Sequence, residues 1–187
     1  MTAQTPLAFR NTKFEATGET KEWFGRTLHQ IRAVADIAAL GIAAGTVGGW
    51  VEKETNLSVY GDAWVYGDAR VYGDAWVSGN AWVYGDAWVY GNARVSGNAR
   101  VSGNARVSGK IIIATRSDGR TFLVVPTSTD GLRIIAGCRY LTIDEARAHW
   151  TETRGGTQLG DESLAIVDHL ERMAAICGLT APVEETA

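Results

Sequence analysis

The chain has 187 residues and a net charge of −3, so it forms one domain or two small ones and is a poor candidate for bulk electrostatic binding of nucleic acid. No charged and apolar leader opens the sequence, and the most apolar run, residues 37–50, is too short and too rich in glycine to span a bilayer. Cys138 and Cys177 form neither a metal-binding spacing nor a disulfide framework, so we expect a soluble cytoplasmic protein that does not bind membranes.

Residues 1–56 precede a long repeat, and we expect them to form a capping segment at the lower end of the repeat fold. Apolar residues recur at every third position from Leu28 to Leu40, which favours an amphipathic helix. The glycines before Trp50 predict a turn, after which Trp50 packs against the first repeat.

Residues 57–113 contain a six-residue repeat of the form Val-x-Gly-[Asp/Asn]-Ala-x. Each valine is followed by glycine two positions later, and no insertion interrupts the series. The valines are Val59, Val65, Val71, Val77, Val83, Val89, Val95, Val101 and Val107. A fixed period sustained in this way is the signature of a repeat architecture.

Two folds could use short strands separated by Gly-Asp or Gly-Asn: an antiparallel meander of two-residue hairpins, or a parallel β-helix. In a meander, the residues that flank each hairpin share a face, so every turn would move alanine and valine to the opposite side of the sheet. In a β-helix, each four-residue strand pairs with the next coil, and every alanine and valine can point into one interior. The repeat therefore predicts a mainly β protein with a parallel β-helix of about three coils, each made of three hexads.

The repeat resembles the hexapeptide repeat of left-handed β-helices, in which a small residue lies four places after an aliphatic one. In those proteins a small residue usually follows the aliphatic position directly, whereas Tyr or Ser takes that place here and glycine comes one later. The resemblance implies left-handed winding and favours a homotrimer.

A narrower resemblance involves FGRTLHQIRAV, GTVGGWVEKETNLS and VYGDAWVYGDARV, which are similar to segments of uncharacterised phage and prophage proteins. The segment AGCRYLTIDEARAHW is likewise similar to phage-type accessory proteins. This resemblance implies a β-helix without assigned chemistry, located in the host cytoplasm. It also implies a strand near residues 26–34, so the conformation of residues 26–44 stays open between strand and helix.

The positions on either side of each valine point outward and form the candidate binding surface. They are aromatic in the early coils and Arg or Ser in the late ones. With eighteen residues in a coil, each tryptophan of the second coil should lie beneath an arginine, and Tyr72 beneath Tyr90. The candidate binding residues are Trp64, Tyr66, Trp76, Trp82, Tyr84, Trp88, Tyr90, Arg94, Arg100 and Arg106.

These stacked side chains have two interpretations. They could simply stabilise a short solenoid, or they could form a surface for a second copy of the chain or a separate partner, since large exposed apolar patches usually mark contacts. The Asp or Asn after each glycine suits a tight turn. Because these residues lie on three different corners, they cannot converge on a cation, and we expect no metal and no cofactor.

Residues 114–179 predict a small α+β domain. Two strands are expected around the Asp118-Gly119 turn, followed by a third strand and space for a fourth before Thr142. A capping box of Thr142 and Glu145 should open a helix through Trp150.

A second helix is expected to end at Gly178, a suitable residue for the position after a helix. Its apolar residues recur at near-helical spacing between Leu164 and Ile176. Residues 180–187 are expected to be a disordered tail.

The sequence does not predict an enzyme. The acyltransferases among hexapeptide β-helices use a histidine base and a projecting loop, and the repeats contain neither. We expect a non-enzymatic phage-type binding protein that inhibits host antiviral defence by binding a host protein or by sequestering a nucleotide signal. The alternatives are a structural or assembly component of a phage particle and a hexapeptide-repeat acyltransferase.

Overall fold

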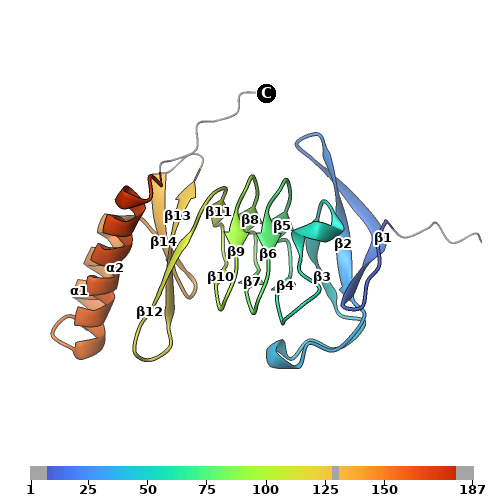
Figure 1. Cartoon of the computed structure of the whole chain (residues 1–187). Helices are drawn as coiled ribbons and strands as arrows, with labels where there is room; N and C mark the ends of the chain where they lie inside the picture. Colours follow the sequence, from blue (N-terminus) through green and yellow to red (C-terminus); the bar gives the residue numbers. More distant parts are fainter. Residues whose placement is uncertain (1–7, 128–130, 180–187) are drawn as a thin grey trace, which may run out of the picture.

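The computed structural model describes residues 8–127 and 131–179, so the expected tail at residues 180–187 lies outside the described part. Three units follow one another along the molecule (Figure 1). An antiparallel hairpin with one added strand comes first, a β-solenoid lies in the middle, and a second antiparallel sheet with two helices ends the chain.

The first unit is a hairpin of β1 (Phe14–Trp23) and β2 (Arg26–Ala33), extended by β3 (Val47–Val51). The helical alternative for residues 26–34 is therefore wrong. Leu28 and Ile31, three positions apart, are both fully buried although side chains alternate along a regular strand. The pairing of β2 with β3 is irregular between Gln30 and Arg32, and such irregularities break strict alternation, so a strand imitates helical spacing here.

There are two short 3₁₀ helices in this region: η1 (Ala38–Leu40) lies between β2 and β3, and η2 (Glu54–Asn56) connects β3 to the solenoid. The sequence suggested a turn at Gly48 and Gly49, but both residues lie inside β3. Glycine is required there because a Cβ on Gly49 would lie 2.7 Å from the Val65 Cγ1 atom and 2.8 Å from the Ala69 carbonyl oxygen. β3 thus runs directly against the first coil.

Eight short strands form the solenoid, and each pairs in parallel with the strand eighteen residues away in the sequence. The strands are β4 (Trp64–Val65), β5 (Arg70–Val71), β6 (Trp76–Val77), β7 (Trp82–Val83), β8 (Trp88–Val89), β9 (Arg94–Val95), β10 (Arg100–Val101) and β11 (Arg106–Val107). The β-helix with three hexads per coil is confirmed, and the meander is excluded. The strands have two residues and not the predicted four: they contain the valine and the residue before it, and the corner turn falls on the Gly and the Asp or Asn of each hexad.

The solenoid interior is a column of alanine and valine. Val71, Val89 and Val107 stack on one side and are fully buried, as are the alanines between the strands, apart from a small exposed edge at Ala75. The corners are formed by glycines with positive φ, and those of successive coils lie directly over one another. One such corner column consists of Gly61, Gly79 and Gly97.

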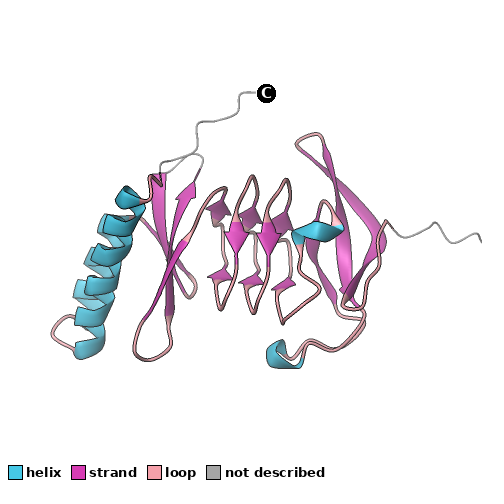
Figure 2. Ribbon diagram, in the orientation of Figure 1, coloured by secondary structure: helices cyan, strands magenta, loops and turns pink. Residues whose placement is uncertain are grey.

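The last unit is a four-stranded antiparallel sheet between the solenoid and the helices (Figure 2). Its strands are β12 (Ile112–Thr115), β13 (Thr121–Thr127), β14 (Gly131–Ala136) and β15 (Arg139–Leu141). Alternation along β13 directs Leu123 and Val125 into the solenoid core, whereas Phe122 and Val124 pack against the helices. One sheet therefore belongs to two hydrophobic cores.

The helices are α1 (Ile143–Arg154) and α2 (Gln158–Ile176). The Thr142–Glu145 capping box of α1 is confirmed, and α2 ends just before Gly178, which has a φ of 62°. Neither helix of the described chain combines the length and the apolar character needed to cross a bilayer.

Lys13 is a buried cation beneath the first coil. Its Nζ donates hydrogen bonds to the carbonyl oxygens of Ser58 and Gly61, at 3.1 and 3.0 Å. Burial lowers the pKa of Lys13 to about 8, and the nearby charge of Asp62 offsets this effect only in part.

The native protein and Lys13→Met should differ in how their free energy of unfolding depends on pH. Between about pH 7.5 and about pH 9.5, this free energy should rise by on the order of 2 kcal/mol more in the native protein. In this window the unfolded chain keeps Lys13 protonated while the folded chain releases the proton. Rising pH therefore removes a desolvation penalty that only the folded state carries. Urea unfolding at the two pH values measures the difference, and identical pH dependence in both proteins would contradict the assignment.

Candidate binding surfaces of the solenoid

The solenoid has three faces, which we name A, B and C. The A face holds β5, β8 and β11, the B face β4, β7 and β10, and the C face β6 and β9. The residue before each valine starts the strand, and these residues stack in columns across the coils. The columns are Trp50–Arg70–Trp88–Arg106 on the A face, Trp64–Trp82–Arg100 on the B face and Trp76–Arg94 on the C face.

The columns place a ring of arginines over a ring of tryptophans. The guanidinium carbon lies 5.3 Å from the indole centroid on the C face, 5.7 Å on the B face and 3.5 Å on the A face. The predicted stacking is thus confirmed for the three pairs, which are Trp76–Arg94, Trp82–Arg100 and Trp88–Arg106.

The stacked arginines keep hydrogen-bonding capacity. Within residues 8–127 and 131–179, none of Arg94, Arg100 and Arg106 forms an ion pair with a carboxylate. Arg94 and Arg100 are exposed, whereas Arg106 donates to the carbonyl oxygens of Asp86 and Asn104, at 2.9 and 3.1 Å. A cation–π contact contributes only about 0.5–1 kcal/mol at an exposed site, so these side chains remain able to bind an anionic group.

The tip of the β1–β2 hairpin folds over the A face. The rings of Trp23 and Trp88 meet edge to face with centroids 4.7 Å apart, and the Arg70 guanidinium lies 4.3 Å from the Trp23 ring centroid. Phe24 touches both tryptophans, with centroids 5.0 Å from Trp23 and 5.9 Å from Trp88. We call Trp23, Phe24 and Trp88 the A-face patch.

Phe24 is the most unusual residue of this patch. Its φ is +46° and that of Gly25 is +70°, so both central residues of the two-residue hairpin are left-handed, as in a type I′ turn. Asn or Asp is favoured at the first of these positions, and a bulky residue with positive φ is rare. The Phe24 side chain is nevertheless 74 % exposed. Sequence reasoning missed Phe24 because it lies outside the repeat.

Beside the patch, Tyr72 and Tyr90 stack with ring centroids 5.3 Å apart and planes inclined by 13°, as predicted. Burial raises the pKa of Tyr72 to about 12, so its hydroxyl stays neutral under physiological conditions. Tyr72 is buried and Tyr90 is half-buried, so the stacked pair is an ordered edge of the A-face patch.

On the B face, the structure corrects one expectation. Trp64 was expected on the exterior with the other outer residues, but its side chain is fully buried. β3 lies against it so closely that a Cβ on Gly48 would be 2.8 Å from the Trp64 Cζ2 atom. Tyr66, in contrast, is 47 % exposed.

The B face remains partly aromatic without Trp64. The rings of Trp82 and Tyr84 are in contact with centroids 5.2 Å apart, and Arg100 lies over Trp82. The surface that remains for contacts is formed by Tyr66, Trp82, Tyr84 and Arg100.

On the C face, a cavity of about 440 Å³ opens between η2 and the stacked pair Trp76–Arg94. Its lining residues are Lys53, Thr55, Asp74, Ala75, Trp76 and Arg94. The volume lies in the range of small-molecule sites. Trp76 is 39 % exposed.

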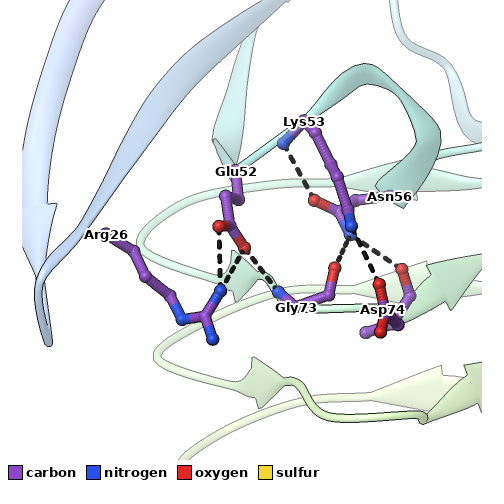
Figure 3. Close-up of polar contacts among 7 residues, drawn as sticks. Arg26, Glu52, Lys53, Asn56, Gly73 and Asp74 are labelled. Atoms are coloured by element: carbon purple, nitrogen blue, oxygen red, sulfur yellow. Dashed lines mark hydrogen bonds and ion pairs between the residues drawn. The ribbon is translucent and has the colours of Figure 1, made fainter.

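Hydrogen bonds hold the wall of this cavity in place (Figure 3). The Lys53 Nζ lies 2.9 Å from the Asp74 Oδ1 atom. Glu52 accepts hydrogen bonds from Arg26 and from the backbone N–H of Gly73, at 2.9 and 2.6 Å. The hydrogen bond and the charge of Lys53 lower the pKa of Asp74, which is therefore ionised at neutral pH.

The candidate residues therefore do not form one site. Trp88, Tyr90 and Arg106 lie on the A face, and Trp76 and Arg94 line the C-face cavity. The others belong to the B face. The cavity is also lined by Lys53 and Asp74. Lys53 lies outside the repeat, and the repeat pattern identified Asp74 only as a corner residue.

The histidines lie on three separate elements. His29 is on β2 at one end of the molecule, while His149 and His169 are on α1 and α2 at the other end (Figure 1). Burial lowers the pKa of His149, which packs against Trp150 at a ring distance of 4.6 Å. None of the three contacts the solenoid cavity.

A family model for the YdcK beta solenoid repeat matches residues 63–79, 69–85, 75–91, 87–100 and 99–113. These segments cover the strands from β4 to β11 and reach the first residues of β12. No curated protein matches the chain. Sequence and structure together show that the chain is a β-solenoid repeat protein, similar over these residues to the YdcK repeat.

Proposed function

We propose that this protein is a non-enzymatic binding protein that engages a partner protein through the A-face patch. The observation that carries the proposal is Phe24, an exposed aromatic side chain held in a left-handed backbone conformation. Such a conformation costs on the order of 1–2 kcal/mol, and strained residues cluster at functional sites. Phe24 contacts the rings of Trp23 and Trp88 but stays 74 % exposed, which favours a role in contact with another molecule.

The surroundings of Phe24 suit a binding anchor. Trp23 and Trp88 hold each other edge to face, and Arg70 is fixed against Trp23. A surface ordered before binding loses little conformational entropy when a partner docks. Aromatic and arginine side chains of this kind carry most of the energy of many protein interfaces.

The resemblance to phage and prophage proteins supports a host protein as the partner, and inhibition of antiviral defence as the result. In bacteria that carry such a defence, expression of the protein should then raise the plating efficiency of a sensitive phage. A variant without Phe24 should leave the plating efficiency low.

Replacement of Phe24 by asparagine is expected to stabilise the fold and weaken partner binding. Asn-Gly is the preferred sequence of this turn, so the free energy of unfolding should rise by about 0.5–1 kcal/mol. Loss of the exposed ring should at the same time weaken partner binding by at least about tenfold, which corresponds to 1.4 kcal/mol. Urea unfolding and affinity capture from host lysate, with the partner identified by mass spectrometry, measure the two effects.

The matched control is Ile176→Asn, which removes a side chain that is 71 % exposed on α2, at the far end of the molecule. It should capture the same partner as the native protein. Equal capture by Phe24→Asn and the native protein would remove the A-face patch from the proposal.

Finer features of the architecture are part of this proposal. Left-handed winding is supported by the hexad period, and a capping role for residues 1–56 by the pairing of β3 with β5. A homotrimer is supported by the exposed aromatic residues of the B face, Tyr66 above all. Light scattering in solution distinguishes three chain masses from one.

A further inference from the structure

The residues that line the cavity on the C face play no part in the proposed binding of a partner protein. We propose that it binds a small anion that carries a planar ring, with the size and chemistry of a nucleoside monophosphate. This site rests on Trp76, Arg94 and Lys53 and is independent of the A-face patch.

Trp76 lies where the chain enters the solenoid, above a residue that is not part of the regular repeat. Leu57 pairs with Val77, which places Asn56 one coil beneath Trp76. The Asn56 side chain is fully buried, and its Nδ2 donates to the carbonyl oxygens of Gly73 and Ala75, at 3.1 and 2.8 Å. The Asn56 side chain is thus directed at these carbonyl groups, and Trp76 is 39 % exposed.

The other two tryptophans of the second coil have a tryptophan or arginine on both sides in their columns. Trp88 lies between Arg70 and Arg106 in its column, and Trp82 lies between Trp64 and Arg100. The three stacked pairs thus share one register, but the pair Trp76–Arg94 lines the cavity and the pair Trp82–Arg100 does not.

The charges in the cavity favour an anion. Lys53 and Arg94 contribute two positive charges and Asp74 one negative charge. Lys53 is paired with Asp74, whereas Arg94 forms no ion pair in the described part of the chain. The free guanidinium offers the planar, two-pronged donor that matches phosphate or carboxylate oxygens.

The remaining lining fits a ring. An indole face binds a nucleobase by stacking, which contributes about 1–3 kcal/mol per base. The exposed Thr55 hydroxyl at the cavity wall can donate to a ligand oxygen. The cavity of about 440 Å³ is open to solvent and has room for one nucleotide.

The test is isothermal titration calorimetry of the full-length protein with adenosine monophosphate. We expect Trp76→Ala and Arg94→Gln each to weaken binding by about tenfold or more. The matched controls Trp82→Ala and Arg100→Gln should change the affinity less than about twofold, because they alter the equivalent pair away from the cavity. Asp74→Asn should tighten binding, because it removes the negative charge beside the anion.

Two further probes separate the ring from the charge. Adenosine and inorganic phosphate should each bind at least about tenfold more weakly than the monophosphate, because each lacks one of the two contacts. Equal binding of inorganic phosphate would overturn the proposal in favour of a simple anion site. No binding of the monophosphate, or equal losses in the control variants, would also overturn it.

Arg94→Gln keeps the test independent of folding, since Arg94 is exposed and its replacement should leave the circular dichroism spectrum and thermal melting unchanged. Failure of nucleotide binding would leave the A-face proposal intact, because Phe24→Asn and Arg94→Gln change different faces.

Discussion

Replacement of Val89 by aspartate is expected to unfold the solenoid. Val89 is fully buried in the middle coil, with Val71 one coil below and Val107 one coil above. A carboxylate at this place would face the methyl and methine groups of valine and alanine side chains. Burial of an unpartnered charge costs several kcal/mol, so the loss should exceed about 4 kcal/mol, a large part of the stability of a domain this size.

Val89→Ala provides the control for packing alone. It removes two methyl groups without adding a charge and should cost about 1–3 kcal/mol. Far-UV circular dichroism and urea unfolding of the three proteins measure the effect. A Val89→Asp protein with a cooperative transition near that of the native protein would show that Val89 is not sealed in the interior.

Alanine substitutions along one corner column are expected to have sharply unequal effects. Gly61, Gly79 and Gly97 have φ values of +70°, +65° and +63°, so alanine suffers nearly the same backbone strain at each position. A Cβ on Gly61 would lie 2.5 Å from the Gly79 carbonyl oxygen, and one on Gly79 would lie 2.9 Å from the Gly97 nitrogen. A Cβ on Gly97 meets nothing within 4 Å.

Gly97→Ala should therefore cost about 1–2 kcal/mol, the price of a left-handed alanine. Gly61→Ala and Gly79→Ala should cost about 3 kcal/mol or more, because the clash involves backbone that cannot move without breaking the ladder. Urea unfolding of the three variants gives the comparison. Equal losses at the three positions would mean that backbone strain alone explains the choice of glycine.

The solenoid could be predicted from the sequence because its information is local and repeated. The parity of Ala63, Val65, Ala69 and Val71 already excluded a meander, and the eighteen-residue offset placed Trp82 under Arg100. The strands and the capping box of the last unit were also predictable, since Asp118-Gly119 and Thr142 are strong local signals.

The candidate sites were less accessible because they depend on contacts between distant segments. The fold of the Trp23–Phe24 tip onto Trp88 joins residues more than sixty positions apart, and no period relates them. Burial of Trp64 follows from the path of β3, which depends on the bulged pairing of β2 with β3. Likewise, the pairing of Leu57 with Val77 is shifted by two residues from the register of the regular coils, and Asn56 turns inward to donate to the carbonyl oxygens of Gly73 and Ala75.

Because the coils share a uniform register, the number of hexads also sets the distance between the two end units of the molecule. Insertion of one whole coil would move the Phe24 tip and the helices about 4.8 Å further apart while both keep their orientation. Insertion of a single hexad would instead rotate one end by about a third of a turn relative to the other, since three hexads complete a coil. Variation in hexad number can therefore set the distance and the angle between two docking elements without any new side-chain contact.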